Sequence, residues 1–301
     1  GLLAKHLFER MLRLPTDVFY SSEFRYGDPL LSPKSLAVFV SQSGETADTL
    51  AALRLCKKLR IRTLGIVNVV GSSIARECDQ VLYVQAGPEI SVASTKAYLG
   101  QVLTIMQMAL YVAKVREMPG VDVAGGLASL RAFSSHVEEV LELEQRCKDL
   151  ADELKSAPLA FYLGRGADAA VALEGALKLK EVSYMPTVEC PAGELKHGPL
   201  ALVEPGAFAV VQATQPSVYG KVASNIKEVE ARSGRVLLLT NDPEEFGDHG
   251  SDTLVLPSTG WPELDALLGV IPMQMIAYWI AKERGCEIDQ PRNLAKSVTV
   301  E

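Results

Sequence analysis

Two carboxylates and one ammonium group lie at helical spacing in the middle of the chain. Glu174, Lys178 and Glu181 are four and three residues apart, so a helix would place them on one face. Apolar residues occupy most of the other positions, which indicates a largely buried helix. A carboxylate beside an ammonium in a closed pocket suits proton transfer on a sugar. The alternative is a ladder of ion pairs on the protein surface, which such a pattern forms more often.

A polar loop follows this helix and contains one of the four histidines of the chain. It reads CPAGELKHGP over residues 190–199, with glycine and proline near both ends, which favours a loop. Between these breakers it carries Glu194, Lys196 and His197. Histidine titrates near neutral pH, so His197 can exchange a proton with a sugar whose ring opens.

A hydroxyl-rich loop in the first half of the chain has the features of a phosphate site. The sequence SQSGET, residues 41–46, comes directly after a predicted strand and directly before a predicted helix. A helix N-terminus offers unpaired backbone N–H groups and the positive end of its dipole, and Gly44 allows a tight turn. The alternative is a helix N-cap without a ligand. The loop matches neither glycine-rich nucleotide pattern, so a small phosphate is favoured over a nucleotide.

Two further polar segments are candidates for the same ligand. The turn SVASTK, residues 91–96, opens another predicted helix. The tail QPRNLAKSVTVE, residues 290–301, has little regular pattern, and its composition alone predicts fraying. Ordering such a tail costs about 1–2 kcal/mol per residue in backbone entropy. If the tail is ordered, we expect burial of Leu294, Val298 and Val300 to offset that cost.

Short apolar strands alternate with amphipathic helices along the chain, which predicts parallel sheets covered by helices on both faces. The expected elements are strands at 35–40, 63–67 and 80–84 with a helix at 46–59, and strands at 207–212, 235–240 and 253–256 with a helix at 218–232. The second set follows the first at a shift of roughly 170 residues, which indicates duplication of a whole domain. The expected organisation is a first domain at 1–119, a helical linker at 120–156, a second domain at 157–288 and a tail at 289–301.

Composition argues against several classes of protein. A formal net charge of -7 makes the chain a poor match for the phosphates of nucleic acid. The five cysteines are dispersed and show no metal-binding spacing, which indicates reduced thiols in a cytoplasmic protein. The apolar stretches are helix-length or shorter and carry polar interruptions, so no membrane span is expected. We therefore expect no metal, no nucleic-acid partner and no membrane partner.

Segments spread over the whole chain resemble the isomerase half of the glucosamine-6-phosphate synthase (glutamine–fructose-6-phosphate aminotransferase) family. They are SQSGETADTL from Ser41, SVASTKAY from Ser91, YLGRG from Tyr162, ALEGALKLKEVSY from Ala172, AGELKHGPLAL from Ala192 and DQPRNLAKSVTVE from Asp289. The last two are the most specific, whereas the first alone marks only the wider sugar-isomerase superfamily. The resemblance implies an α/β fold of two tandem sugar-isomerase domains, flavodoxin-like with parallel sheets, and a C-terminal active-site tail.

The resemblance also implies roles for individual residues. The implied substrate-binding residues are Ser41, Gln42, Ser43 and Thr46 at the phosphate, with Val92, Ser94, Glu174 and Ala295 elsewhere in the site. Glu181 resembles the base that moves hydrogen between C1 and C2 of the sugar, and Lys178 its charged companion. Lys296 resembles the tail lysine that meets the open-chain ketone, where an imine can form. His197 resembles the ring-opening group, which the partner subunit of a homodimer supplies.

The implied reaction makes glucosamine 6-phosphate from fructose 6-phosphate and ammonia. The ring opens, ammonia adds at C2, water leaves, and a proton is removed from C1 and returned at C2. No cofactor is expected, because the imine already acidifies the C1 proton. In a full-length protein, a glutaminase domain would supply the ammonia.

Two parts of the family pattern are missing from this sequence. The family has a strand ending in a Cys-Gly-Thr-Ser turn just before the helix that begins here at Gly1, and it has a glutamine-hydrolysing domain. The first domain is therefore expected to lack its N-terminal strand. A parallel sheet without that strand leaves backbone groups unpaired, so an exposed edge is expected beside the strand at 35–40.

Three other functions stay open. A deaminase of the same superfamily would run the reaction towards fructose 6-phosphate, but the tail favours the synthase. A non-catalytic sugar-phosphate sensor would keep the loop at 41–46 without needing Glu181, Lys178 or Lys296. A structural dimerisation module would need neither the loop nor these three residues.

Overall fold

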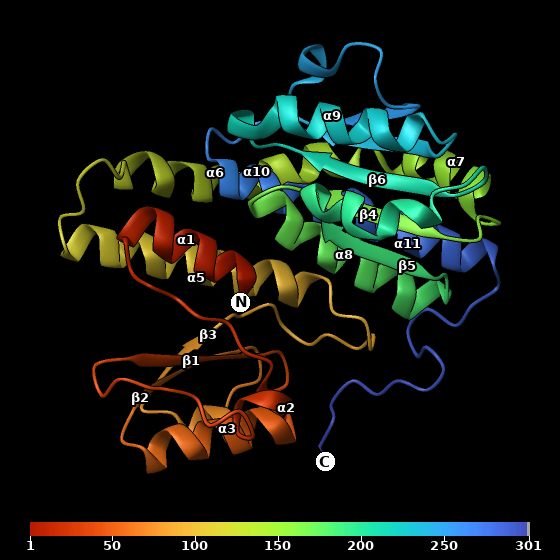
Figure 1. Ribbon diagram of the computed structural model, residues 1–301. Coiled ribbons are helices and arrows are strands. Elements are labelled where there is room, and N and C mark those ends of the chain that lie inside the picture. Colours follow the sequence, from red (N-terminus) through yellow and green to blue (C-terminus); the bar gives the residue numbers. More distant parts are fainter. Residues whose placement is uncertain (300–301) are drawn as a thin grey trace. The chain divides into compact units, whose positions relative to one another are not determined.

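The structure is a computed structural model that describes residues 1–299. Its internal contacts divide the chain into two compact units. The first comprises Gly1–Val121 together with the tail from Arg292, and the second comprises Asp122–Pro291. Each unit contains its own sheet, and every strand pair in both sheets is parallel. The predicted α/β class with two parallel sheets is confirmed (Figure 1).

The first unit is built on a three-stranded sheet in the order β1-β2-β3. Its elements are α1 (Leu2–Leu12), α2 (Ser21–Phe24), β1 (Leu36–Ser41), α3 (Ala47–Lys58), β2 (Arg62–Val67), α4 (Ser73–Glu77), β3 (Gln80–Tyr83) and α5 (Lys96–Val115). Helix α3 packs on β1 and β2, and α1 packs along α5. The core under α3 includes Leu53, Cys56 and Ile74, which are fully buried. This packing fixes the loop between β1 and α3 at the carboxyl end of β1.

Strand β1 lies at one edge of this sheet. Among the described residues it pairs with β2 alone, in a register that sets Ser41 beside Val67. Its first residue, Leu36, is 53% exposed. The expected exposed edge beside this strand is confirmed. The corresponding strand of the second unit, β6 (Phe208–Ala213), is paired on both sides.

The second unit is built on a five-stranded sheet in the order β5-β4-β6-β7-β8. Its strands are β4 (Ala160–Gly164), β5 (Thr187–Pro191), β6, β7 (Arg235–Thr240) and β8 (Asp252–Val255). Its helices are α6 (Val123–Leu141), α7 (Glu144–Leu154), α8 (Ala167–Ser183), α9 (Tyr219–Glu230), α10 (Pro262–Leu268) and α11 (Val270–Glu283). Short 3-10 turns are η1 (Ala192–His197), η2 (Pro199–Leu202), η3 (Pro216–Val218) and η4 (Pro243–Phe246). The helices expected as a linker, α6 and α7, pack in this unit against α10 and α11.

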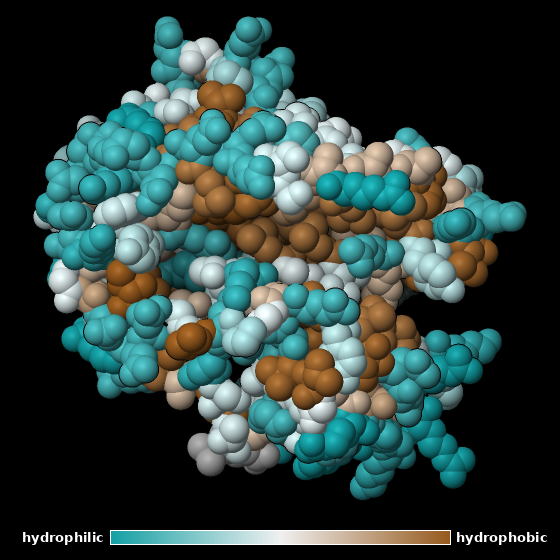
Figure 2. Space-filling model, turned by 180° about the vertical axis from the view of Figure 1, so that it is seen from behind, coloured by the Kyte–Doolittle hydropathy of each residue, from teal (hydrophilic) through white to brown (hydrophobic). Residues whose placement is uncertain are grey.

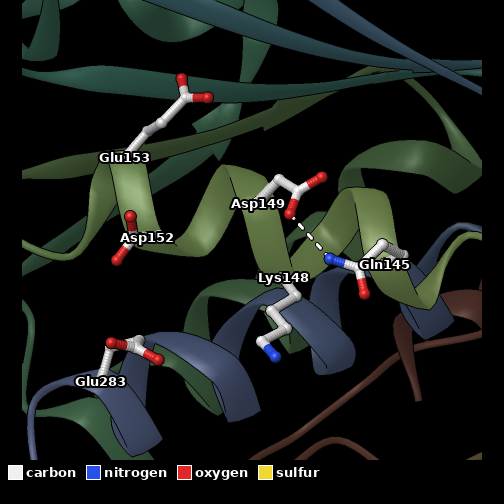
Figure 3. Close-up of a pocket in the computed structure, with 6 residues that line it drawn as sticks. All are labelled: Gln145, Lys148, Asp149, Asp152, Glu153 and Glu283. Atoms are coloured by element: carbon white, nitrogen blue, oxygen red, sulfur yellow. Dashed lines mark hydrogen bonds between the residues drawn. The ribbon is translucent and has the colours of Figure 1, made fainter.

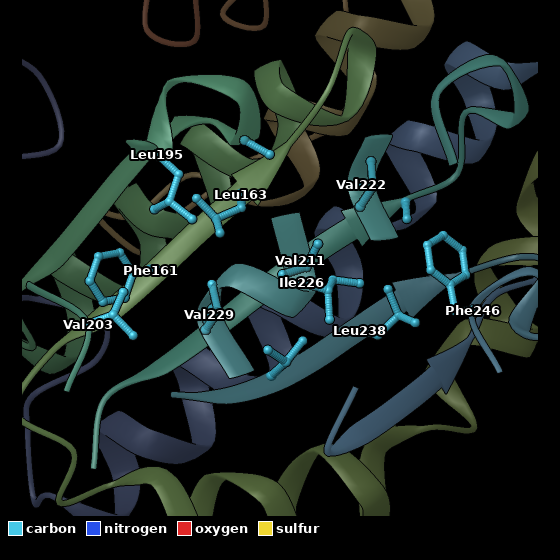
Figure 4. Close-up of a cluster of buried hydrophobic side chains, with 14 of the residues drawn as sticks. Phe161, Leu163, Leu195, Val203, Val211, Val222, Ile226, Val229, Leu238 and Phe246 are labelled. Carbon is cyan, nitrogen blue, oxygen red and sulfur yellow. The ribbon is translucent and has the colours of Figure 1, made fainter. Parts of the chain in front are cut away.

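The core of the second unit explains why its strands are continuous apolar runs. Every residue of β4 and β6 is buried, as expected for strands covered on both faces. Phe161 and Leu163 of β4 point to a cluster that α9 completes, as Figure 4 shows. Tyr162, between them, faces Gly175 of α8 and Met273 of α11 on the other side. A Cβ at Gly175 would lie 2.2 Å from the Met273 sulfur, so glycine permits the close approach of the two helices.

One helical stretch in the second unit, Pro262–Glu283, is long and apolar enough to cross a membrane by composition. Of its most apolar window, 78% is buried inside the structure, as in the core helix of a folded domain.

Large apolar side chains also remain at the surface of the first unit, among them Tyr111 (69% exposed) and Val115 (63% exposed) of α5. Figure 2 shows hydrophobic residues gathered in patches among hydrophilic ones on one face.

Asp168, at the start of α8, ties together the carboxyl ends of β4 and β6. Its buried carboxylate accepts hydrogen bonds from the backbone N–H of Thr214 (2.8 Å), the Thr214 hydroxyl (2.5 Å) and the Gln212 amide (2.9 Å). Burial raises the pKa of Asp168 to about 6, and the bonds from Thr214 and Gln212 act in the opposite direction.

Replacing Asp168 with alanine should destabilise the second unit. The substitution leaves buried donors of Thr214 and Gln212 without an acceptor, so we expect a loss of about 1–3 kcal/mol in the free energy of unfolding. The control Asp152→Ala, at an exposed position, should change it by less than about 0.5 kcal/mol. Because the pKa of folded Asp168 lies above its ordinary 3.8, its contribution should decline as the pH rises through about 6. Urea unfolding at several pH values measures both effects, and equal losses in the two variants would contradict the proposed role.

Candidate functional site

The loop at residues 41–46 connects β1 to α3 and forms a compact polar turn. Gly44 has a φ of +68°, and a Cβ there would lie 2.1 Å from the Ser72 hydroxyl, so only glycine fits. The Ser41 hydroxyl accepts a hydrogen bond from the backbone N–H of Gly44 (3.0 Å) and lies 3.3 Å from the Thr46 hydroxyl. The Ser43 hydroxyl accepts one from the backbone N–H of Glu45 (3.2 Å). The hydroxyls predicted to hold a phosphate therefore converge on one turn.

The start of α3 is not capped by its own side chain. Thr46 is the N-cap residue but makes no capping hydrogen bond, because its hydroxyl lies against Ser41. The backbone N–H of Ala47, the first residue of the helix, donates instead to the carbonyl of Val298 in the tail (3.0 Å). A plain N-cap therefore does not account for the three hydroxyls in this loop.

The tail lies on this loop. The hydroxyls of Ser297 and Ser43 are 3.2 Å apart. Lys296 donates from its ammonium to the carboxylate of Glu89 (2.7 Å) and to the hydroxyl of Ser94 (3.1 Å). The structure thus brings together three segments predicted to share a ligand: the loop at 41–46, the turn at 91–96 and the tail.

The side chains expected to anchor the tail do not do so. Leu294 is 47% exposed and Val298 is 54% exposed, so the expected burial of these two residues is wrong. Polar contacts of Lys296, Ser297 and the Val298 carbonyl hold the tail instead. Val300 lies outside the described residues.

Gln42, Val92 and Ala295 are the remaining predicted site residues of the first unit. Gln42 and Val92 are partly buried, and Ala295 is exposed in the tail. The backbone carbonyl of Gln42 accepts a hydrogen bond from the backbone N–H of Asn68 (3.2 Å), which fixes the loop to the end of β2.

In the second unit, the predicted acid–base residues lie together on α8. The ammonium of Lys178 is 2.7 Å from a carboxylate oxygen of Glu181 and 3.3 Å from one of Glu174. Its side chain is only 6% exposed, so this is no surface ladder of ion pairs. Burial acts to lower the pKa of Lys178, but the charges of Glu174 and Glu181 outweigh it and raise that pKa above its ordinary value. Lys178 therefore stays an ammonium between two carboxylates at neutral pH.

Two residues of α9 that the sequence did not single out, Asn225 and Glu228, help to hold the loop that carries His197. Arg165, directly after β4, donates two hydrogen bonds to the Asn225 amide oxygen (3.1 and 3.0 Å). Its guanidinium packs under Gly193, where a Cβ would come within 3.0 Å. Lys196 pairs with Glu228 of α9 (2.8 Å). The imidazole of His197 is exposed.

A cavity on the outside of the second unit contains none of the predicted site residues. It is lined by Gln145, Lys148, Asp149, Asp152, Glu153 and Glu283. Figure 3 shows these residues on α7 and α11, and Lys148 also lies 4.7 Å from the centre of the Trp279 ring. Four carboxylates would repel a sugar phosphate, so this cavity does not fit the predicted substrate.

Comparisons with known proteins agree with the geometry. The SIS-domain family matches residues 1–111 and 153–283. The glutamine–fructose-6-phosphate aminotransferase (isomerizing) of Caldanaerobacter subterraneus subsp. tengcongensis is 44% identical over 302 aligned residues, which cover 100% of this chain and 50% of that protein. The chain thus spans about half the length of the curated relatives it matches.

Two solved structures are similar over nearly the whole chain. The C-terminal domain of glucosamine-fructose-6-phosphate aminotransferase from Francisella tularensis has a TM-score of 0.93 and 36% identity, covering 97% of this chain and 83% of that one. Glucosamine-6-phosphate deaminase from Thermotoga maritima has a TM-score of 0.81 and 26% identity, covering 99% of this chain and 86% of that one.

Proposed function

This chain belongs to the SIS-domain family and corresponds to the isomerase half of the aminotransferases it resembles, and we propose that it converts fructose 6-phosphate and ammonia into glucosamine 6-phosphate. The observation that supports this most is the position of Lys296. Its ammonium lies at the Ser94 hydroxyl, in a tail that also contacts the hydroxyl-rich loop through Ser297. A primary amine beside a turn that is proposed to bind an anion is suited to a phosphorylated ketone.

In the proposed reaction, the loop at 41–46 binds the phosphate of the sugar. Hydroxyls and backbone N–H groups at a helix start bind anions without a full positive charge. Once the ring has opened, the Lys296 ammonium gives up a proton to solvent, and its neutral amine adds to the C2 carbonyl. Water then leaves as an imine forms. Ammonia then adds at C2 and releases the lysine amine, which leaves an imine that carries the substrate nitrogen.

Glu181 is the proposed base for the isomerisation that follows. Its carboxylate takes a proton from C1, which is acidified by the neighbouring imine, and the proton is returned at C2. In the same rearrangement the C1 hydroxyl becomes an aldehyde, and its proton passes to the nitrogen at C2. Lys178 is proposed to stabilise the negative charge that develops on oxygen, because its ammonium is buried beside Glu181. Glu174, on its other side, keeps that ammonium oriented.

A homodimer in the cytoplasm is also part of the proposal. His197 is exposed on its loop, which suits a group that opens the sugar ring in a partner subunit. Exposed apolar side chains such as Tyr111 and Val115 offer surface for a second copy. In a full-length protein of the kind this chain matches, a glutaminase domain would supply the ammonia.

Removing hydroxyls from the loop at 41–46 should weaken binding of the phosphorylated sugar selectively. Ser43→Ala and Thr46→Ala each remove a donor to an anion, which costs on the order of 1.5–3 kcal/mol. We expect roughly 10- to 100-fold weaker binding of fructose 6-phosphate and little change for fructose. Calorimetry with both sugars measures this, with Ser22→Ala, an exposed serine of α2, as the control. Equal effects on the two sugars would rule out a phosphate site in this loop.

Deamination of glucosamine 6-phosphate is the second candidate function. The likeness to the Thermotoga maritima deaminase favours it, because that structure covers 99% of this chain. Use of glutamine by the full-length protein separates the two, since only the synthase needs a source of ammonia. Release of ammonia from glucosamine 6-phosphate, with no amino sugar formed from fructose 6-phosphate, would favour the deaminase.

A further inference from the structure

We propose that Glu89 positions Lys296 for its reaction, an inference that rests on the function proposed above. Its carboxylate lies 2.7 Å from the Lys296 ammonium, although the two residues are far apart in the sequence. The Glu89 side chain is 4% exposed and that of Lys296 is 24% exposed. A charged pair at this depth needs a carboxylate that is itself well fixed.

The two oxygens of Glu89 have separate partners. One accepts hydrogen bonds from the backbone N–H groups of Thr95 (2.9 Å) and Ala97 (3.2 Å) at the start of α5. The other accepts the hydrogen bond from Lys296. The start of a helix favours a negative charge, and Thr95, the N-cap residue of α5, makes no capping bond with its own side chain. Glu89 is thus anchored to the fold through one oxygen and presents the other to the tail.

Glu89 stays ionised at neutral pH in this setting. Burial acts to raise its pKa, but the bonds from Lys296, Thr95 and Ser94 outweigh it and hold the pKa below its ordinary value. The anionic carboxylate suits every state of the lysine nitrogen that carries positive charge. These states are the free ammonium and the protonated imine, so the carboxylate can hold the nitrogen in place before and after the imine forms.

Two further contacts hold the described part of the tail without directing this side chain. The bonds at Ser297 and Val298 fix the backbone near the loop at 41–46, and neither touches the lysine nitrogen. Leu294 is 47% exposed and so offers limited apolar packing. Glu89, with Ser94 as a weaker second acceptor, therefore sets the direction of the Lys296 amine.

The test replaces Glu89 with glutamine, which keeps an amide oxygen for the start of α5 and removes the charge. We expect the kcat for amino-sugar formation to fall about 10- to 100-fold, with KM for fructose 6-phosphate changed by less than about threefold. Borohydride labelling of Lys296 in the presence of fructose 6-phosphate should slow by a similar factor. Without sugar, backbone amides of residues 292–299 should exchange faster with deuterated water.

The control is Asp79→Asn, which alters another carboxylate of the first unit. Asp79 accepts a hydrogen bond from the backbone N–H of Thr63 (2.9 Å) and lies 3.8 Å from the Lys57 ammonium. The control variant should leave kcat, labelling and tail exchange unchanged. Lys296→Met gives a second route if Glu89→Gln unfolds. It leaves Glu89 bonded to the start of α5 and should still speed exchange in the tail.

The outcomes separate this inference from the proposed function. One outcome is faster tail exchange in Glu89→Gln together with no borohydride labelling of the wild type. It would support the role of the ion pair in holding the tail but overturn the reaction assigned to Lys296. Normal labelling rates and normal tail exchange in a folded Glu89→Gln variant would overturn the positioning role. A uniform rise in exchange throughout the first unit would show that Glu89 serves only the fold.

Discussion

Replacing Lys296 with arginine should abolish amino-sugar formation while the chain stays folded. Arginine keeps the positive charge and can still bind the carboxylate of Glu89, so the tail should remain on its loop. Its guanidinium stays protonated and is not a nucleophile, so no imine can form with the sugar ketone. We expect turnover to fall at least about a thousandfold, which corresponds to about 4 kcal/mol of transition-state stabilisation.

Two measurements check this result for Lys296. Borohydride with fructose 6-phosphate should label the wild-type chain at residue 296 and leave the arginine variant unlabelled. Lys282→Arg, a lysine of α11 that lies against the Trp279 ring, is the matched control and should keep normal turnover. An arginine variant at 296 with near-normal turnover would show that the tail amine takes no covalent part in the reaction.

Replacing Glu181 with glutamine should stop the transfer of hydrogen between C1 and C2. General-base catalysis is worth about 10²- to 10⁴-fold, so we expect a loss of that size in kcat. Binding of fructose 6-phosphate should change little, because its phosphate is assigned to the loop at 41–46. The control Glu189→Gln removes a carboxylate that pairs with the exposed Lys180 and should leave kcat unchanged. A Glu181→Gln variant with normal kcat would exclude this carboxylate as the base.

Glu181→Gln, combined with His197→Ala, also tests whether the site is shared between subunits. His197→Ala should be inactive if His197 opens the ring, because the cyclic sugar offers no ketone to the lysine. Mixing inactive His197→Ala with inactive Glu181→Gln should then restore part of the activity in heterodimers. If subunits exchange, as shown by mass spectrometry of the mixture, and activity stays absent, His197 does not act across a subunit boundary.

The strands and helices could be predicted from the sequence because their signal is local. Strand β7 lies at Arg235–Thr240, as its apolar run predicted, and β1 and β6 differ from their predicted ranges by one residue at each end. Strands buried on both faces are continuous apolar runs, and helices show the 3.6-residue period. The cluster on α8 was visible for the same reason, since Glu174, Lys178 and Glu181 are held together by helical spacing.

Contacts between distant segments could not be predicted in this way. The tail was expected to depend on Leu294 and Val298, yet both are exposed and an ion pair with Glu89 takes their place. Glu89 comes just before the turn at 91–96. No residue spacing in the sequence marks it as a site residue, because its partner Lys296 lies at the other end of the chain. Arg165 lies in YLGRG, one of the segments that carry the family resemblance, but only the fold reveals its contact with Asn225.

Formation of glucosamine 6-phosphate from labelled substrates tests the proposed function most directly. Fructose 6-phosphate and nitrogen-15-labelled ammonium are incubated with the wild-type chain, with Lys296→Arg and with Glu181→Gln, and the products are followed by NMR. We expect the wild type to form glucosamine 6-phosphate with labelled nitrogen on C2, and both variants to form at most traces of it. Absence of labelled amino sugar with the wild type under conditions where fructose 6-phosphate binds, or equal formation by all three proteins, would contradict the proposal.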